Sequence, residues 1–188
     1  MEPLLTTFIA AALAEWGDKT QLLVAALGAR YRRPAPILAG IAVAALANSA
    51  LAAFGGTYIH GVITPRAVSL LVAMALLLAG GGGFFRSKTP DMGAGWRVGP
   101  FLTTAACFFL LEFGDKTQFV TAALAAQFGA LALAALGAAA GILASSVPAA
   151  VLGARFAAAI PLRGIRIAAG VLFLLAGLVI AVNALRLA

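Results

Sequence analysis

Charged residues are scarce in this chain of 188 residues: they make up 10% of it, and only six of them are acidic. Soluble domains typically carry charge on about a quarter of their residues, so the composition argues against a water-soluble domain. Hydrophobic residues make up 63% of the chain, and the mean hydropathy is +1.07. Apolar runs of about 20 residues, long enough to cross a bilayer, lie at 35–59, 67–85, 130–154 and 167–185. We therefore expect a single transmembrane domain over residues 1–188.

Cysteine and histidine are nearly absent, with one residue of each, Cys107 and His60. A single cysteine excludes a disulfide or a redox pair within the chain. Zinc and copper sites usually recruit histidine or cysteine, so no such site is expected. The net charge of +7 comes largely from arginines in short turns between apolar runs. Lipid headgroups and membrane topology explain these arginines better than a nucleic-acid partner does.

Two copies of one sequence make up the chain. The heptapeptide EWGDKTQ at 15–21 returns as EFGDKTQ at 112–118, and the same shift of 97 residues aligns PLLTT (3–7) with PFLTT (100–104). We divide the chain into repeat one (about 3–85), a loop (86–97) and repeat two (about 100–187). The first apolar segment resembles a secretory signal peptide. Its counterpart lies in mid-chain, however, so we expect a retained transmembrane helix.

Each repeat has the pattern of three apolar helices separated by turn signals, so the expected fold is an all-α membrane protein. Because three crossings is an odd number, repeat two must enter the membrane from the opposite side. This is the inverted-topology repeat typical of secondary transporters. The first and fourth helices carry the heptapeptides and are expected to cross at the bilayer centre. The six expected helices cover about 4–29, 35–60, 66–85, 100–127, 129–156 and 162–187.

The basic residues predict the orientation of these helices. Nine of them follow the first, third and fifth helices, and two lie on the other side. Because basic loops tend to stay in the cytoplasm, we expect both termini outside a prokaryotic plasma membrane and the three basic turns inside. The nine are Arg30, Arg32, Arg33, Arg86, Lys88, Arg97, Arg155, Arg163 and Arg166, and the two are Arg66 and Arg186.

The heptapeptide holds two acidic residues three positions apart. On a continuous helix Glu15 and Asp18 would share a face, as would Glu112 and Asp115. The motif begins about eleven residues into its helix, roughly 17 Å at 1.5 Å per residue, which is near the bilayer centre. An ionisable side chain there costs about 2.5 kcal/mol or more. These side chains are therefore expected to face one another, a bound ion or water.

Charge and ligand type define the expected site. Four carboxylates (−4) and the charge-balancing Lys19 and Lys116 (+2) leave a charge of −2, which one divalent cation would neutralise. All available donors are oxygens, which favour Ca²⁺, Mg²⁺ or Mn²⁺. Protonation of the carboxylates when the cation leaves would permit cation/proton exchange. The expected metal ligands are Glu15, Asp18, Thr20, Gln21, Glu112, Asp115, Thr117 and Gln118.

Two further groups of residues have alternative interpretations. Gly17 and Gly114 lie between the carboxylates, where they would either allow close helix approach or break the helix and expose carbonyl groups. Polar pairs also occupy equivalent positions of the second and fifth helices, where they would either complete the site or hydrogen-bond the helices. These pairs are Asn48 with Ser49 and Ser145 with Ser146.

The two motifs together resemble those of the Golgi-type calcium/manganese transporter family, which is defined by a duplicated Glu-x-Gly-Asp-Lys/Arg-Thr/Ser sequence and includes bacterial manganese exporters. The resemblance covers essentially the whole chain. It implies a secondary transporter of the calcium:cation antiporter group that moves Mn²⁺ or Ca²⁺, as a substrate and not a bound cofactor, in exchange for protons. The short loop at 86–97 has one acid, Asp91, and departs from relatives in which this loop is long and acidic. The implied ion-binding residues are Glu15, Asp18, Thr20, Glu112, Asp115 and Thr117.

Other interpretations of the motif compete with this one. The carboxylates could hold the amine of a small organic solute such as an amino acid, which would make the chain an exporter of that solute. Paired aspartates could form an intramembrane protease, but the adjacent lysines would keep both aspartates ionised, whereas such a dyad must share a proton. We therefore do not expect an enzyme. The chain could also be a scaffold, in which Glu15 and Lys19 form an i,i+4 ion pair that only holds helices together, and Glu112 and Lys116 do the same.

Overall fold

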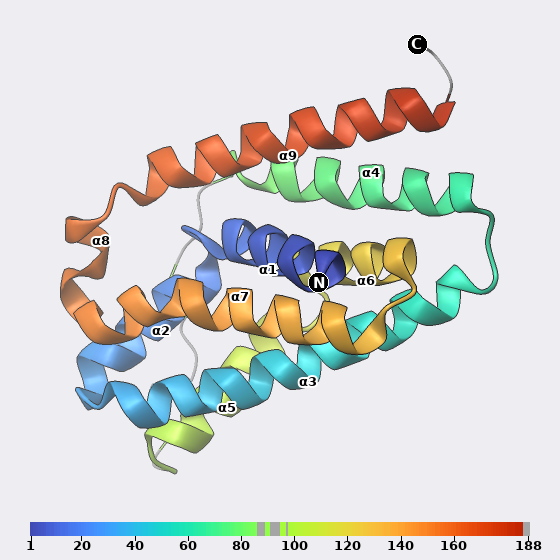
Figure 1. The fold of residues 1–188 in the computed structure, drawn as a ribbon. Helices are drawn as coiled ribbons and strands as arrows, with labels where there is room; N and C mark the ends of the chain where they lie inside the picture. Colours follow the sequence, from blue (N-terminus) through green and yellow to red (C-terminus); the bar gives the residue numbers. More distant parts are fainter. Residues whose placement is uncertain (86–88, 91–94, 97, 186–188) are drawn as a thin grey trace.

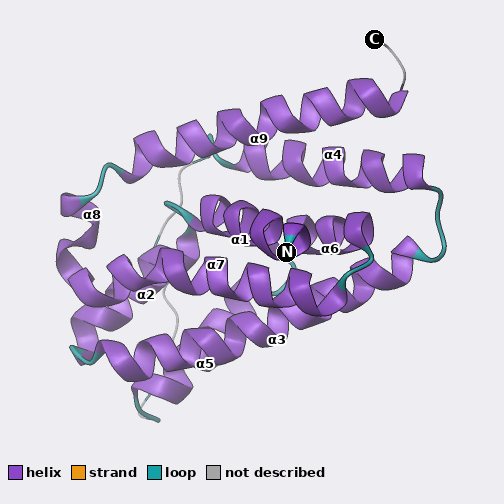
Figure 2. Cartoon of the chain, viewed as in Figure 1, coloured by secondary structure: helices purple, strands orange, loops and turns teal. Residues whose placement is uncertain are grey.

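In a computed structural model, residues 1–85, 89–90, 95–96 and 98–185 are described, and they contain helices, turns and loops but no strand (Figure 2). The helices of repeat one are α1 (Glu2–Glu15), α2 (Lys19–Tyr31), α3 (Pro34–His60) and α4 (Pro65–Gly82). Those of repeat two are α5 (Pro100–Glu112), α6 (Lys116–Phe128), α7 (Leu131–Leu152), a 3-10 turn η1 (Gly153–Arg155), α8 (Phe156–Ala159) and α9 (Leu162–Leu185).

Four of the expected membrane helices are present within the described residues. Helices long and apolar enough to cross a membrane cover Pro34–His60, Pro65–Gly82, Leu131–Ala159 and Leu162–Leu185. The two expected helices that carry the motifs, 4–29 and 100–127, are each divided into two shorter helices, and a break was one of the two alternatives considered for the motif glycines. The six-crossing inverted arrangement stays a prediction, as does the orientation of the termini and loops. Among the basic and acidic loop residues named above, Arg86, Lys88, Asp91, Arg97 and Arg186 lie outside the described residues.

Figure 1 shows how the helices are arranged around the two motifs. Helices α4 and α9 lie side by side, and α1 and α6 lie between this pair and the helices α3 and α7. Equivalent helices of the two repeats make equivalent contacts, because α1 packs along α7 and α5 packs along α3. Small residues permit these approaches: a Cβ on Gly40 would lie 2.7 Å from the carbonyl oxygen of Phe101, and Gly137 meets the equivalent residue, Leu4. The helices α1 and α5, which lead into the two motifs, thus each pack against a helix of the other repeat.

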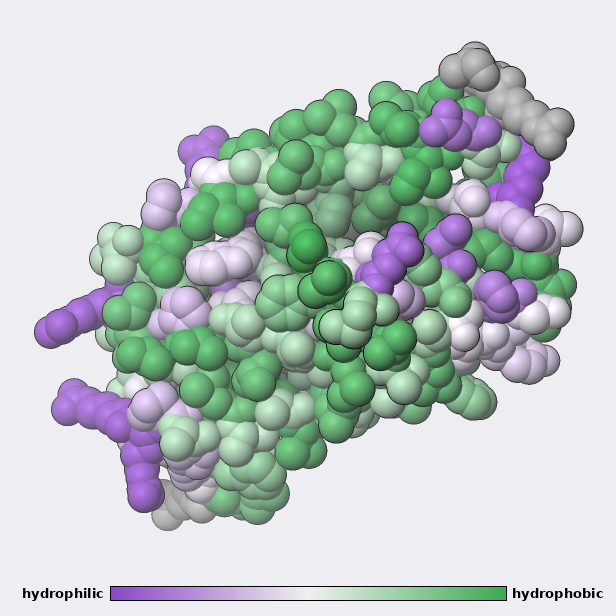
Figure 3. Space-filling view, in the orientation of Figure 1, coloured by the Kyte–Doolittle hydropathy of each residue, from purple (hydrophilic) through white to green (hydrophobic). Residues whose placement is uncertain are grey.

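The surface of the molecule is largely apolar. Figure 3 shows hydrophobic residues over most of the visible face, with hydrophilic residues gathered mainly towards the two ends. Large apolar side chains on the outside of α9, such as Leu172, Leu175 and Leu178, are more than half exposed. An apolar surface of this extent on a soluble monomer would be unusual, so these side chains are expected to face lipid.

Candidate cation site

A turn between Glu15 and Asp18 divides the first motif segment. Trp16 has φ −64° and ψ 120°, Gly17 has φ +74°, and the amide of Asp18 donates to the carbonyl of Glu15 at 3.1 Å. These are the features of a type II β-turn, whose third residue needs a positive φ and is therefore usually glycine. The turn ends α1 at Glu15 and lets α2 begin at Lys19.

The second motif adopts the same turn. Phe113 has φ −63° and ψ 120°, Gly114 has φ +75°, and the amide of Asp115 donates to the carbonyl of Glu112 at 3.0 Å. Two roles were considered for the motif glycines: both glycines break their helix, and among the described residues Gly17 alone also lies in close contact with another helix, α9. The expectation that the glutamate and aspartate of each motif share one helix face is wrong, because the helix stops between them.

A glutamine fixes each turn to a helix of the other repeat. The amide N–H of Gly17 donates to Gln21 Oε1 at 2.9 Å, and Gln21 Nε2 donates to the carbonyl of Ser145 in α7 at 2.6 Å. In the same way, Gly114 donates to Gln118 Oε1 at 2.7 Å, and Gln118 Nε2 donates to Asn48 Oδ1 in α3 at 3.1 Å. Gln21 and Gln118, which were expected to be metal ligands, therefore make equivalent hydrogen bonds that connect each turn to a helix of the other repeat.

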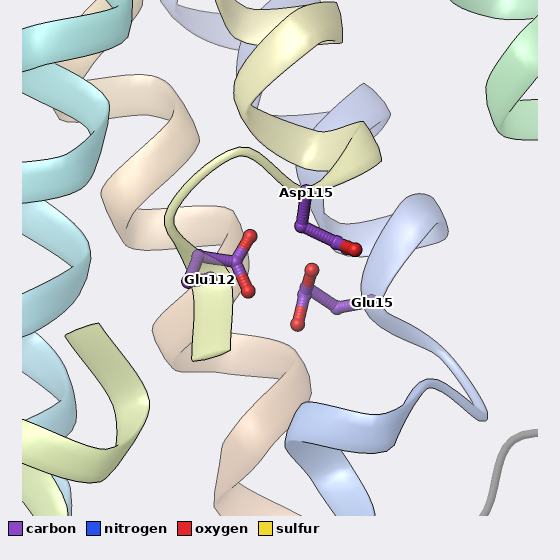
Figure 4. Close-up of side chains that lie close together, drawn as sticks. All are labelled: Glu15, Glu112 and Asp115. Carbon is purple, nitrogen blue, oxygen red and sulfur yellow. The ribbon is translucent and has the colours of Figure 1, made fainter. Parts of the chain in front are cut away.

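Three of the four motif carboxylates converge. Carboxylate oxygens of Glu15, Glu112 and Asp115 lie within 4.8 Å of one another, and Figure 4 shows the three groups pointing towards a common space. Both glutamates are fully buried. The fourth carboxylate, Asp18, is not a member of this group and is paired with Lys116. Because the cluster contains residues of both motifs, neither repeat could form it alone.

The two glutamates differ in their hydrogen bonds. Thr20 Oγ1 donates to Glu15 Oε2 at 2.5 Å, and Thr117 Oγ1 donates to Glu15 Oε1 at 2.6 Å. Both threonines, one from each repeat, thus serve the same carboxylate. Neither oxygen of Glu112 has a hydrogen-bond partner among the described residues. Buried polar atoms normally have partners, so the Glu112 carboxylate is an exception among the buried groups of this site.

The lysines form ion pairs between the repeats. Lys19 Nζ lies 2.7 Å from Asp115 Oδ1, and Lys116 Nζ binds the carboxylate of Asp18 and lies 3.5 Å from Asp115 Oδ2. The i,i+4 pairs of the scaffold interpretation, Glu15 with Lys19 and Glu112 with Lys116, are not found among the ion pairs of the described residues. The aspartates also precede α2 and α6 directly, where the positive end of the helix dipole favours an anionic side chain.

The polar pairs of α3 and α7 mainly make hydrogen bonds between and within helices. Asn48 Nδ2 donates to the carbonyl of Phe109 in α5 at 3.1 Å, in addition to accepting from Gln118. The hydroxyls of Ser145 and Ser146 both donate to the carbonyl of Ile142. The buried hydroxyl of Ser49 has no partner among the described residues.

The sequence did not single out Arg166 as a residue of this region. It was assigned to a basic turn, but it lies in the first turns of α9, and its guanidinium donates to the carbonyl oxygens of Gly83 and Gly17. The only sequence signal was a negative one: the equivalent residue of repeat one is Ser69, so the arginine belongs to one repeat alone.

Comparison with known proteins identifies the family. Residues 3–91 and 100–187, which correspond closely to the two repeats, each match the family described as "Divalent cation/proton antiporter GDT1". A protein of Vibrio cholerae serotype O1 named "Putative manganese exporter" is 39% identical over 128 residues, which cover 68% of this chain and 64% of that relative. No solved structure matches the chain. The family consists of transporters and not enzymes, as expected from the motifs. The chain therefore belongs to the GDT1 family of divalent cation/proton antiporters.

Proposed function

We propose that this protein exchanges Mn²⁺ for protons across a membrane. A single site, formed by residues of both repeats, binds the Mn²⁺ and the protons in turn. Glu15, Glu112 and Asp115 supply the converging carboxylates, and Asp18 joins them when a cation competes with Lys116. The observation that carries this proposal is the buried carboxylate of Glu112, which has no hydrogen-bond partner among the described residues and faces two other carboxylates. A hard divalent cation is the ligand that such an oxygen cluster favours.

The charges support one divalent cation per chain. The four motif carboxylates and the two motif lysines sum to −2, and their interaction is strong where little water screens it. Protons can replace the cation, because a departing cation leaves carboxylates whose negative charge is costly inside a membrane. The same oxygens then serve alternately as metal ligands and proton carriers, which agrees with the antiporter description of the family.

The choice of Mn²⁺ rests on the name of the Vibrio relative. Ca²⁺ is a second candidate substrate, because both ions prefer oxygen ligands. The cavity beside Asp18 and Lys116 has a volume of about 20 Å³ but is not lined by Glu15, Glu112 or Asp115, so the choice of a cation over an amino acid rests on the carboxylate cluster. A water needs roughly 10–15 Å³ by the same measure, so this cavity holds about one water.

The test is uptake of Mn²⁺ and of Ca²⁺ into proteoliposomes, with and without a pH gradient. We expect the wild-type protein to move Mn²⁺, the gradient to drive the flux, and Glu112→Gln to abolish it. Glu2→Gln is the matched control, because it removes an exposed carboxylate at the start of α1 and should leave the flux unchanged.

Two results would contradict the proposal. Mn²⁺ flux that neither moves protons nor responds to the gradient would remove the exchange mechanism. Folded wild-type protein that moves neither cation would redirect the search to organic solutes.

A further inference from the structure

The two motif turns have the same backbone but different surroundings. A Cβ placed on Gly17 would lie 3.0 Å from the carbonyl oxygen of Leu162 and 3.2 Å from Cβ of Arg166, both in α9. A Cβ placed on Gly114 would meet no atom of the described residues within 4 Å. The start of α9 therefore covers the turn of repeat one, whereas the turn of repeat two has no such cover.

Arg166 connects this cover to two other elements. Its Nε donates to the carbonyl oxygen of Gly83, at the end of α4, at 3.0 Å, and one terminal nitrogen donates to the carbonyl oxygen of Gly17 at 3.4 Å. One side chain thus ties α9 to both α4 and the α1–α2 turn. The equivalent residue of repeat one, Ser69, donates to the carbonyl of Pro65 within its own helix at 3.1 Å. The connection has no counterpart on the other turn.

The side chain of Arg166 also lines a cavity next to the carboxylate cluster. This cavity of about 20 Å³ lies among α1, α4, α6 and α9, and Asp18 and Lys116 line it together with Arg166. A divalent cation passing through it would meet the positive charges of both Lys116 and Arg166, which repel it. Asp18 offsets one of these charges through its pair with Lys116, so Arg166 supplies the remaining positive charge of the cavity lining.

The contacts of Arg166 suit a connection that must open and close. Among the described residues, the hydrogen-bond partners of its side chain are carbonyl oxygens and not carboxylates. Breaking an ion pair in a buried site leaves an uncompensated charge, which is costly. Release of the two carbonyl groups leaves no unpaired carboxylate behind, and Arg166 is only partly buried, so water can solvate its guanidinium once these bonds break.

We propose that Arg166 is a positioning residue that closes the cation site on the face of the α1–α2 turn, and that its release from Gly17 and Gly83 is a step of transport. The second part rests on the proposed function, while the closure itself does not. The role belongs to repeat two alone, so the turn at Gly114 has no equivalent closure among the described residues.

The test measures access to the cavity without requiring transport. Ala79, a buried residue of α4 that lines the cavity, is replaced by cysteine in a Cys107→Ala background, which removes the native thiol. The labelling rate with a membrane-impermeant methanethiosulfonate reagent is then measured from each side of proteoliposomes. We expect Arg166→Gln to raise this rate at least tenfold from one side, and Arg166→Lys to raise it less, because lysine keeps the charge but lacks the forked donors.

Arg163→Gln is the matched control, because it removes the same charge one turn earlier in α9 from a side chain that has no ion pair or hydrogen bond among the described residues. Unchanged labelling in Arg166→Gln, or an equal rise in Arg163→Gln, would overturn the proposal. A separate Arg166→Gln variant that keeps Ala79 and the buried Cys107 reports unfolding through labelling of Cys107. If that labelling rises, Arg166→Lys decides: a rise at position 79 without a rise at Cys107 supports the closure, and no rise at position 79 overturns it.

Transport separates the two parts of the proposal. We expect Arg166→Gln to slow Mn²⁺ exchange at least fivefold. Loss of Mn²⁺ transport in the wild type would refute the proposed function and leave the labelling result standing. A labelling rise with unchanged Mn²⁺ exchange would refute the claim that release of Arg166 is a step of transport.

Discussion

Repeat one and repeat two share a motif, a type II turn and a glutamine that hydrogen-bonds this turn to a helix of the other repeat. They differ in the hydrogen bonds that their glutamates accept and in the residues that contact their turns. Glu15 accepts hydrogen bonds from Thr20 and Thr117, whereas Glu112 accepts none from the described residues. The start of α9 covers the turn at Gly17 and leaves the turn at Gly114 open. Nearly identical local sequences have therefore formed two unequal halves of one cluster.

This difference separates the features that each repeat forms by itself from the features that depend on both repeats together. The turn and its glutamine depend on contacts that each copy can make in the same way, so both copies make them. The two threonine hydroxyls instead converge on one carboxylate, and a hydroxyl has a single proton to donate. Hydrogen bonds to Glu15 are then unavailable to Glu112, and the symmetry of the sequence is lost at the centre of the site.

The largest expected effect separates the two glutamates. Both Glu15→Gln and Glu112→Gln should weaken Mn²⁺ binding at least 100-fold, or about 2.7 kcal/mol, because each removes a charged ligand. Their effects on stability should be opposite. Glu15→Gln leaves one threonine hydroxyl without its acceptor, at about 1–3 kcal/mol, whereas Glu112→Gln removes a buried carboxylate that no hydrogen bond stabilises.

Isothermal titration with Mn²⁺ and thermal unfolding in detergent without metal measure these two effects. An equal loss of metal-free stability in both variants would show that the two glutamates are equivalent after all.

The lysine pairs should also be unequal. Lys116 contacts both Asp18 and Asp115, with 20% of its side chain exposed, whereas Lys19 contacts Asp115 alone and is 34% exposed. Loss of one partner from a buried ion pair costs about 3 kcal/mol or more, and exposed pairs contribute about 1 kcal/mol or less. Lys116→Gln should therefore lower the unfolding temperature more than Lys19→Gln does, and the reverse order would contradict the arrangement of these pairs.

The motif glycines test the cover provided by α9. A left-handed conformation costs a residue with a Cβ about 1–2 kcal/mol, so both Gly17→Ala and Gly114→Ala should destabilise the protein. Gly17→Ala should cost more, because its Cβ would also press on Leu162 and Arg166. Chemical or thermal unfolding of the two variants in parallel measures the difference. Equal losses would mean that α9 yields to the added methyl group and does not constrain the turn.

The smallest expected effect concerns the threonines. Thr20→Val and Thr117→Val should each cost about 1 kcal/mol, and the two costs should be similar although the residues belong to different repeats. In double-mutant cycles, both should couple to Glu15→Gln and neither to Glu112→Gln, because contacting residues are non-additive and independent ones add. Coupling of Thr117 to Glu112 would show that each threonine serves the glutamate of its own repeat.

The sequence predicted the apolar helices and the residues of the cluster for direct physical reasons. Helices α3, α4, α7 and α9 follow from the length of their apolar runs, and the meeting of Glu15 with Glu112 follows from the cost of burying either one alone. The helix breaks were left open, because a single glycine costs a helix only about 1 kcal/mol. The dihedral angles show that each motif glycine occupies the third position of a type II turn. Glycine is typical of this position, so the sequence Glu-x-Gly-Asp is compatible with such a turn.

The unequal pairing could not be predicted. EWGDKTQ and EFGDKTQ differ at one position, so no sequence pattern distinguishes the threonine that stays in its repeat from the one that crosses. The role of Arg166 could not be predicted for a related reason. Comparison of the repeats identifies residues that are the same in both, whereas Arg166 aligns with a serine. Both features depend on packing between the repeats, which the local sequence does not encode.

The central claim is that two repeats build one cation site, and the stoichiometry of Mn²⁺ binding tests it most directly. Titration of the purified full chain should give one Mn²⁺ per chain, and this site should be lost when either Glu15 or Glu112 is replaced by glutamine. Two equivalent Mn²⁺ per chain, or one site that survives either substitution, would contradict the claim, because each repeat would then bind its own ion.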